Sequence, residues 1–234
     1  NFTTGKLSIP KHNYFENFAV NAGHTIALEV PILIAEHLKS ESKDDRAILI
    51  ETFDDVTVSA YNYQRLSSDI TPVLPVKQLG NEYIISSYFG FITSISSEFL
   101  IIATENNTII DITPSAKTLG GKAANTLFSI TLNKGESYLV KGADYTDLTG
   151  SIIKVNENSG SCKPIAVFSG AECIRVPINC TACDHIFSQA LPTATWGTEY
   201  LAFPFEETSQ FTYRVIAKEN NTNIVINGTI NANI

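Results

Sequence analysis

The chain has 234 residues, of which 44% are hydrophobic and 17% are charged, and its formal net charge is −8 at pH 7. This hydrophobic share is that of a folded globular protein, and the small charged share excludes a disordered chain. The acidic balance argues against nucleic acid as a partner, because that contact needs basic patches that face phosphates. No run of residues approaches the ~18 apolar positions of a membrane-spanning helix, so we expect no membrane insertion in this segment.

Strand patterns follow one another along the whole chain. Runs rich in Ile, Val, Thr, Tyr and Phe recur about every ten residues, and each has the length of a strand. The only helix-like stretch is Ile34–Ser42. The expected strands, in chain order, are Phe18–Val20, Thr25–Val30, Ala47–Phe53, Val56–Tyr61, Glu82–Tyr88, Phe99–Thr104, Thr108–Thr113, Leu127–Leu132, Ser137–Lys141, Ser151–Val155, Pro164–Phe168, Glu199–Phe203, Phe211–Ala217 and Asn223–Asn227.

The second half of the chain repeats the first. Gly80 and Gly197 stand at equivalent places 117 residues apart, and Asn106 and Asn220 do so 114 residues apart. Two fainter matches, at offsets of 112 and 109, extend the repeat backwards. Four anchors in one order, with slowly changing offsets, indicate a duplicated unit with loops of different length. The matched segments are Leu74–Tyr83 with Leu191–Tyr200, Ile102–Thr108 with Ile216–Thr222, Asn21–Gly23 with Asn133–Gly135, and Val56–Ser59 with Ile165–Phe168.

The duplication predicts an all-β chain of two tandem seven-stranded β-sandwiches. About seven short strands in ~115 residues is the size of an immunoglobulin-like or jelly-roll sandwich. We place the first sandwich at residues 1–118 and the second, with the cysteine-rich connection, at residues 119–234. Blades like those of a β-propeller are the alternative, although four or more would be needed to close one. The polar turns Asn106-Asn107 and Asn133–Gly135 predict hairpins between the strands that flank them.

Four cysteines lie within 22 positions, at Cys162, Cys173, Cys180 and Cys183. An even, clustered set suggests two disulfides and an oxidising compartment. The rival interpretation is a zinc site that uses Cys180, Cys183 and His185, but structural zinc prefers two separate ligand pairs and the chain has one C-x-x-C. Free thiols are a third alternative.

Five N-x-Ser/Thr sequons make asparagines candidates for glycosylation. Two of them recur at equivalent turns of the repeat, where surface glycans are expected. This position supports secretion. The sequons begin at Asn1, Asn106, Asn179, Asn220 and Asn227.

The sequence gives little indication of catalysis, since the chain has no H-E-x-x-H, G-x-S-x-G or P-loop motif. Ser169-Gly170 has no nearby histidine, and the neighbours Asp184 and His185, a possible acid–base pair, would face opposite ways on a strand. Asp144, Asp147 and the loop Lys43–Asp45 could ligate calcium, but their spacing matches no calcium loop. We expect no catalytic residue, no metal and no cofactor.

One stretch of the second half contains a distinctive set of segments: Lys163–Gly170, Cys173–Pro177, Cys183–His185, Gln189, Leu191-Pro192 and Trp196-Gly197. This set resembles the N-terminal domain of the IgGFc-binding protein family. The first half agrees with that domain more loosely, through Asp55–Val58, Leu74-Pro75, Leu79-Gly80 and Tyr83.

The resemblance implies an extracellular, non-enzymatic interaction domain that is usually part of a much longer polypeptide. It also implies a disulfide between Cys173 and Cys183, which leaves Cys162 for Cys180. Immunoglobulin binding is not carried over, because no ligand residues can be matched.

We interpret the chain as an interaction or adhesion module of a secreted or cell-surface glycoprotein, for mucus, matrix or adhesive assembly. The expected partners are extracellular proteins or glycans, including other copies or modules of the same polypeptide. A bacterial cell-surface adhesin domain is one alternative, and an extracellular hydrolase is another. We expect the connection Cys173–Trp196 to be the contact region, because glycans at Asn106 and Asn220 would block that end of a sandwich.

Overall fold

The computed structural model describes residues 2–64, 67–89, 95–160, 163–176, 178–203, 212–226 and 229–233. These residues form antiparallel β-sheets with little helix, and no helix among them is long and apolar enough to cross a membrane. The helical elements are η1 (Pro10–His12), α1 (Ile32–Ala35), η2 (Val76–Gln78), η3 (Glu157–Ser159) and η4 (Thr193–Thr195). The strands are β1 (Phe2–Ile9), β2 (Tyr14–Asn21), β3 (Lys43–Asp44), β4 (Leu49–Thr52), β5 (Val58–Gln64), β6 (Ser67–Val73), β7 (Glu82–Ile84), β8 (Ser97–Ala103), β9 (Thr108–Thr113), β10 (Phe128–Leu132), β11 (Ser137–Lys141), β12 (Ile152–Val155), β13 (Ile165–Ile174), β14 (Asp184–Gln189), β15 (Asn223–Ile226) and β16 (Thr229–Asn233).

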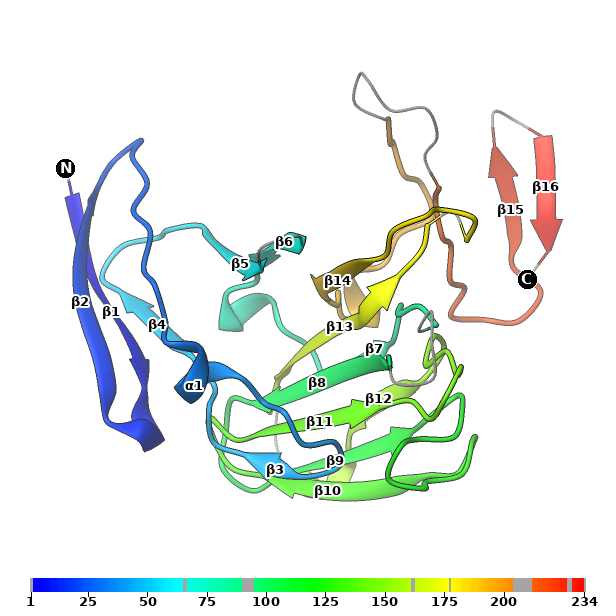
Figure 1. The fold of residues 1–234 in the computed structure, drawn as a ribbon, viewed down its shortest axis with the longest axis horizontal. Coiled ribbons are helices and arrows are strands. Elements are labelled where there is room, and N and C mark those ends of the chain that lie inside the picture. The colour runs from blue at the N-terminus through cyan, green and yellow to red at the C-terminus, as the bar shows by residue number, and fades with distance from the viewer. Residues whose placement is uncertain are drawn as a thin grey trace.

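The centre of the molecule is a sandwich of two antiparallel sheets, drawn mainly in green in Figure 1. One sheet has the strand order β10-β9-β12-β7 and the other has the order β14-β13-β8-β11-β3. Every second side chain of β8 and of β9 is buried between the sheets, as expected of strands with one face on a core. Full burial of one large apolar side chain stabilises the fold by about 1.5–3 kcal/mol. The buried core comprises Tyr83, Ile85, Phe99, Ile101, Ala103, Ile110, Ile112, Leu132, Tyr138, Val140, Leu148, Ile153, Val155, Ile165 and Val167.

This sandwich combines strands from both copies of the repeat. β8, from the first copy, lies between β11 and β13 of the second, and β9 lies between β10 and β12. Two tandem seven-stranded sandwiches are therefore not seen, although the all-β class is confirmed. Strand pairing does not divide at residue 118, so the division into 1–118 and 119–234 stays a prediction about the sequence repeat.

The two predicted hairpins are wrong, although their strands are confirmed. β8 and β9 belong to different sheets, and so do β10 and β11. The turn at Asn106-Asn107 has a positive φ at Asn107 alone, 55°, whereas a type I′ hairpin turn needs two such residues. In the turn Asn133–Gly135, Gly135 supplies the residue with a positive φ, 78°. The two strands at each turn belong to different sheets, and each directs its apolar side chains into the core from its own sheet. These short turns therefore carry the chain from one layer of the sandwich to the other.

The two ends of the chain lie outside the sandwich. Figure 1 places the sheet β2-β1-β4 at one end of the molecule and the ladder β15-β16 at the other. The predicted strands at Thr25–Val30 and Glu199–Phe203 are not strands, nor is the described part of Phe211–Ala217, and the expected helix shortens to α1. Sequence reasoning missed β1, β3, β6, β14 and β16. The other predicted strands are present, some with shifted ends.

The duplication is visible in local geometry. In each copy a Pro precedes a 3-10 turn, and the Gly that follows donates its N–H to a Tyr hydroxyl three residues on. The distance is 2.9 Å from Gly80 N to Tyr83 Oη and 2.8 Å from Gly197 N to Tyr200 Oη. The burial of the two tyrosines differs, however. Tyr83 is 0% exposed inside the sandwich, and Tyr200 is 73% exposed.

This pair supplies a matched test of the core. The Tyr83 hydroxyl donates to the carbonyl of Ile165 at 2.6 Å and accepts from Gly80, so Tyr83→Phe leaves buried polar groups without these bonds. We expect a loss of about 1–3 kcal/mol in the free energy of unfolding, measured by chemical denaturation. Tyr200→Phe, at the equivalent exposed position, should cost less than about 0.5 kcal/mol. Equal losses would contradict the assignment of Tyr83 to a unique core.

Candidate functional site

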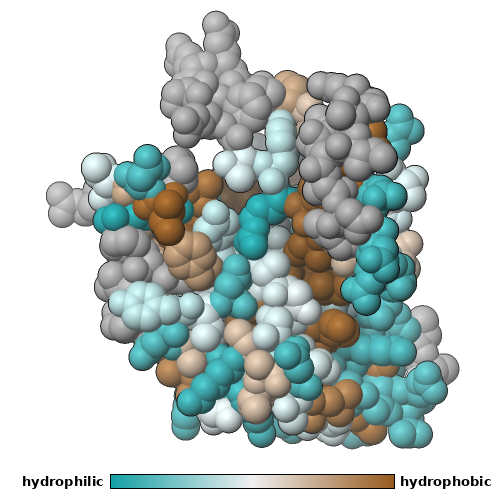
Figure 2. All heavy atoms as spheres, turned by 90° about the vertical axis from the view of Figure 1, so that its right-hand side faces the viewer, coloured by the Kyte–Doolittle hydropathy of each residue, from teal (hydrophilic) through white to brown (hydrophobic). Residues whose placement is uncertain are grey.

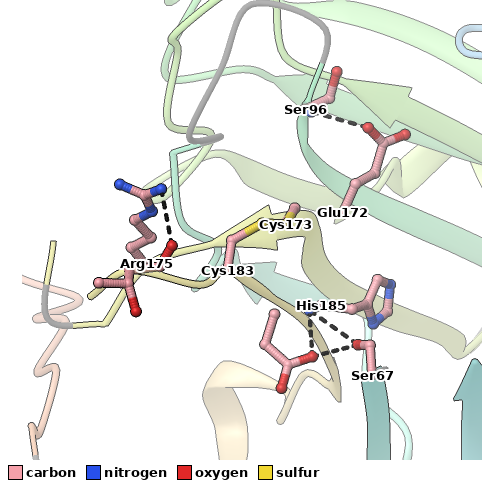
Figure 3. The surroundings of a disulfide bond; sticks show 9 residues. Ser67, Ser96, Glu172, Cys173, Arg175, Cys183 and His185 are labelled. Carbon is pink, nitrogen blue, oxygen red and sulfur yellow. Dashed lines mark hydrogen bonds between the residues drawn. A yellow bond between two sulfur atoms is a disulfide. The ribbon is translucent and has the colours of Figure 1, made fainter. Parts of the chain in front are cut away.

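The expected contact region begins at a hairpin closed by a disulfide. β13 and β14 pair, and at the loop end of this hairpin Cys173 is bonded to Cys183, with a Cα–Cα distance of 5.3 Å (Figure 3). The register of the pair shifts between Ala171 and Ile174, so a bulge lies next to the bridge. We call residues 174–176 and 178–182 the bridged loop. Its apolar side chains Val176 and Ile178 are exposed.

The structure contains the pairing of Cys173 with Cys183 that the family resemblance implied. The second expected bridge, Cys162–Cys180, is not seen among the described residues, where Cys180 has a free thiol. Cys162 itself lies outside the described residues. Since the bridge occupies Cys183, the rival zinc set of Cys180, Cys183 and His185 lacks one of its thiolates.

A charged cluster fixes the bridged hairpin to the sandwich. Glu172 accepts from the backbone N–H of Ser96 at 3.1 Å and from Lys141, and Lys141 also lies 3.5 Å from Glu98. Burial raises the pKa of the Glu98 carboxyl, although the Lys141 charge opposes this shift. Burial acts to lower the pKa of Lys141, but the hydrogen bond to Glu172 and the two carboxylate charges raise it overall. The hairpin is thus anchored through half-buried charges next to the disulfide.

A seam of side-chain contacts joins β6 to β14, which are equivalent strands of the two copies. The hydroxyl of Ser67 donates to Asp184, and the N–H of His185 donates to that hydroxyl at 3.2 Å (Figure 3). Further along, Gln189 N–H donates to Thr71 Oγ1 at 3.0 Å. The strands form no backbone ladder with each other. Among the described residues, hydrogen bonds that involve polar side chains therefore join the two copies along this line.

In the seam, the side chains of Asp184 and His185 have different partners, as expected of adjacent strand residues. The imidazole Nδ1 of His185 contacts the carboxylate of Asp69 on β6, while Asp184 accepts from Ser67. Ser67 contacts the backbone of His185 and not its ring, so the nucleophile–base hydrogen bond of a hydrolase is missing. Sequence reasoning missed Ser67 and Asp69, because β6 has no strong strand pattern.

The other predicted candidates lie apart from the seam. The hydroxyl of Ser169, within β13, donates to the carbonyl of Ser86 at 2.9 Å and faces no base. Among the described residues, His12 clusters with Asp44 and Asp45 closely enough for a metal ion. However, Asp44 already binds Arg46 Nε at 3.1 Å, and His12 binds Asp45 at 3.0 Å. Both carboxylates therefore already have a partner, Asp44 the guanidinium of Arg46 and Asp45 the imidazole of His12.

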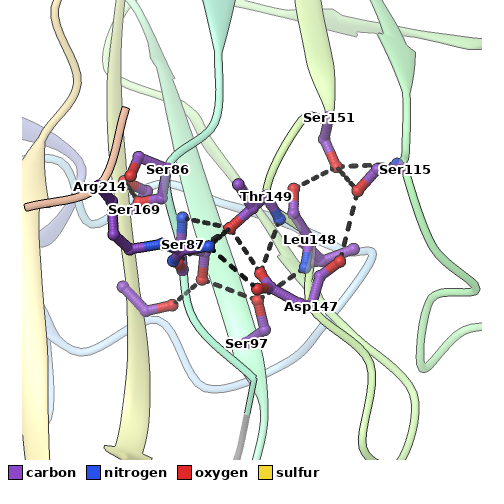
Figure 4. A network of polar contacts seen from close by, with 11 residues as sticks. Ser86, Ser87, Ser97, Ser115, Asp147, Leu148, Thr149, Ser151, Ser169 and Arg214 are labelled. Atoms are coloured by element: carbon purple, nitrogen blue, oxygen red, sulfur yellow. Dashed lines mark hydrogen bonds and ion pairs between the residues drawn. The ribbon is translucent and has the colours of Figure 1, made fainter. Parts of the chain in front are cut away.

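A polar network closes one end of the sandwich (Figure 4). The hydroxyls of Ser87 and Ser97 are 2.7 Å apart, and Ser97 also accepts from the N–H of Leu148 at 2.9 Å. Asp147 accepts from the N–H of Thr149 at 2.8 Å. Arg214 reaches this network from the C-terminal part of the chain and lies 4.5 Å above the ring of Tyr88. The hydroxyls bond to backbone groups and to one another, which is a structural role.

The asparagines of the described sequons are exposed. Asn106 and Asn220 each lie in a turn, and Asn179 lies in the bridged loop. The Asn106 side-chain oxygen accepts from the N–H of Lys134 at 3.1 Å. Asn1 and Asn227 lie outside the described residues. All five stay predictions as glycosylation sites.

Comparison with known proteins agrees with the resemblance. The family model described as IgGFc binding protein matches residues 69–234. Human IgGFc-binding protein is 27% identical over 184 residues, which cover 77% of this chain and 3% of that protein. The chain thus spans a small part of its relative's length. No solved structure matches the chain.

Removal of the disulfide should destabilise the bridged hairpin. The bridge closes a short loop, with a sequence separation of 10, and constrains the unfolded chain. For Cys173→Ser with Cys183→Ser we expect a loss of about 2–3 kcal/mol in the free energy of unfolding, measured by denaturation without reductant. Cys180→Ser is the control and should leave stability unchanged. An equal effect of both changes would show that Cys180 takes part in a bridge.

The pKa of Glu98 gives a pH dependence of stability. Because its pKa is raised in the folded state, folding takes up a proton here, and the contribution of Glu98 is present at acid pH and lost as the pH rises through the folded pKa. We expect the stability of the wild type relative to Glu98→Gln to increase on acidification from neutral pH. Denaturation of both proteins over a pH series measures this, with the exposed Glu157→Gln as charge control. A relative stability that falls on acidification would contradict the raised pKa.

Proposed function

The chain belongs to the IgGFc-binding protein family, and on that premise we propose that it is a non-enzymatic interaction module of a secreted or cell-surface glycoprotein. In this proposal it serves adhesion or assembly in mucus or matrix. The human relative is named for binding the Fc part of IgG. For this chain we propose extracellular proteins or glycans as the partner class.

The observation that carries the proposal is the bridged loop. Ile178 is 65% exposed and Val176 is 42% exposed. The disulfide joins the two ends of the loop, and Glu172 binds Ser96 next to one of them. Exposed apolar side chains on a pre-ordered loop favour protein contact, because little conformational entropy is lost on binding. A disulfide also favours an oxidising, extracellular compartment.

The polar side chains of the described residues support a non-enzymatic role. Ser67 and Ser169 each bond to groups other than an imidazole, and the Asp69–His185 pair lies in the seam between two strands. An extracellular hydrolase would need a nucleophile or a paired acid and base that face a substrate. The described seam presents no such arrangement.

Glycans would separate the two extracellular alternatives. The exposed Asn106, Asn179 and Asn220 are open to an oligosaccharide transferase, so occupancy in native material favours a eukaryotic secreted glycoprotein. Unmodified asparagines favour a bacterial cell-surface adhesin of the same family. A glycan at Asn179 would also cover part of the bridged loop.

The test is binding of the whole chain to purified extracellular glycoproteins. With mucin and IgG Fc as probes in surface plasmon resonance, we expect binding to at least one. Ile178→Asp should weaken that binding at least about tenfold, because a charge would enter a desolvated contact. Tyr145→Asp, at a similarly exposed position elsewhere, should leave it unchanged. Binding to neither probe, or equal weakening by both variants, would count against the proposal.

A further inference from the structure

The ribbon β5–β6 lies beside β14 and directs one of its two faces at that strand (Figure 1). Ser67, Asp69 and Thr71 are alternate residues of β6, and the side chain of each one bonds to a group of β14. Side chains of adjacent strand residues point to opposite faces. Ser68 and Ile70 therefore lie on the face of the ribbon that points away from β14.

The face that points away from β14 carries two exposed aromatic rings. In the register of the ribbon, Tyr61 lies opposite Ile70 and Tyr63 lies opposite Ser68, so these four side chains share one face. Tyr61 is 72% exposed, Tyr63 is 86% exposed and Ile70 is 54% exposed. We call these four residues the tyrosine face.

The equivalent positions of the second copy serve contacts within the chain. By the offset of 109 between Val56–Ser59 and Ile165–Phe168, Tyr61 is equivalent to Gly170 and Tyr63 to Glu172. A Cβ atom at Gly170 would come within 2.0 Å of the carbonyl oxygen of Ile186, and Glu172 binds Ser96 and Lys141. In the first copy the same two positions hold large rings that face solvent. This difference favours a role in binding over a role in packing.

Two rings in a row differ from ordinary exposed apolar side chains. Single apolar residues among polar ones are normal on a protein surface, and the face shown in Figure 2 has this mixture. Tyr61 and Tyr63 instead stand two residues apart on the same face of one strand, which separates their Cα atoms by about 7 Å. A tyrosine combines a rigid apolar ring with a polar hydroxyl, and it loses little conformational entropy on binding. The pair therefore suits an extended ligand that is both apolar and polar.

Charge narrows the class of ligand. The four residues of the tyrosine face are uncharged, while the chain as a whole has a net charge of −8. A polyanionic ligand would be repelled by this overall charge, and a cationic ligand would find no carboxylate within the tyrosine face. A sugar ring presents C–H groups on its faces and hydroxyl groups at its edge. It therefore matches an aromatic ring that is flanked by the hydroxyls of tyrosine and serine.

We propose that the tyrosine face binds an uncharged saccharide chain, with one sugar ring stacked on Tyr61 and another on Tyr63. Ile70 adds apolar contact opposite Tyr61, and the Ser68 hydroxyl offers a hydrogen bond opposite Tyr63. This site is distinct from the bridged loop. It names a glycan class for the interaction module proposed above and rests on that proposal only for the extracellular setting.

Isothermal titration calorimetry of the whole chain tests the site. The probes are the uncharged hexasaccharides chitohexaose, cellohexaose and maltohexaose, and we expect binding to at least one of them. Tyr61→Ala and Tyr63→Ala should each weaken that binding at least about tenfold, because each removes a stacked ring. Tyr61→Phe and Tyr63→Phe keep the rings and should weaken it less. Tyr145→Ala, which removes a similarly exposed tyrosine elsewhere, should leave it unchanged.

The controls separate lost binding from lost folding and from the bridged loop. All tyrosine variants should unfold at the wild-type denaturant concentration, since the replaced rings face solvent. Binding to none of the hexasaccharides, or equal weakening by Tyr145→Ala, would overturn the proposal. So would weakening by Ile178→Asp, which would place the saccharide on the bridged loop. If the hexasaccharides fail but mucin or IgG Fc still binds through Ile178, only the tyrosine face is refuted and the proposed function stands.

Discussion

The pairing of strands across the two copies is the constraint on which the rest of the structure depends. β8 and β9 are central strands, and a central strand is stable only if both of its edges find a ladder. All four of these edges are met by strands of the other copy. The first copy therefore cannot bury Ile101 or Ile110 by itself. The core of the sandwich forms where the end of one copy meets the start of the next.

This arrangement also determines where the polar groups gather. Strands that cross between layers leave backbone groups at the ends of the sandwich, and serine and threonine hydroxyls satisfy them there, as Ser97 does for Leu148. Where equivalent strands meet without a ladder, at β6 and β14, side chains such as Asp69 and His185 take over. The hydroxyl, carboxylate and imidazole groups at these places thus stabilise the fold through hydrogen bonds. The bridged loop, in contrast, exposes the apolar side chains of Val176 and Ile178.

The sequence predicted well those strands whose signal is local. Thr108–Thr113 and Ser137–Lys141 alternate strongly, and the structure has them with the same ends. β6 was missed because Ser, Asp and Pro interrupt its pattern. It pairs with the neighbouring β5, but its side chains also contact β14, more than a hundred residues away. Glu199–Phe203 was predicted as a strand from its pattern, but a pattern forms a strand only beside a partner. Which sheet a strand joins is likewise a property of distant residues.

The candidate site was predictable in part. The family resemblance led to Cys173 and Cys183, since the spacing of cysteines alone allows three pairings. The sequence also singled out Asp184 and His185, as adjacent residues that could form an acid–base pair. Their true partners, Ser67 and Asp69, come from the other copy and carry no motif. Only the folded chain brings them together.

The pairing of strands across the two copies has a consequence for proteins that contain more than two such repeats. If each sandwich forms at a junction, a series of repeats contains one sandwich fewer than it has repeats. Insertion of a further repeat of about 117 residues adds one junction and leaves the two terminal halves as they were. A gene that lengthens by whole repeats would then keep every existing core intact. A deletion that removes part of a repeat would instead damage the junctions on both sides of it.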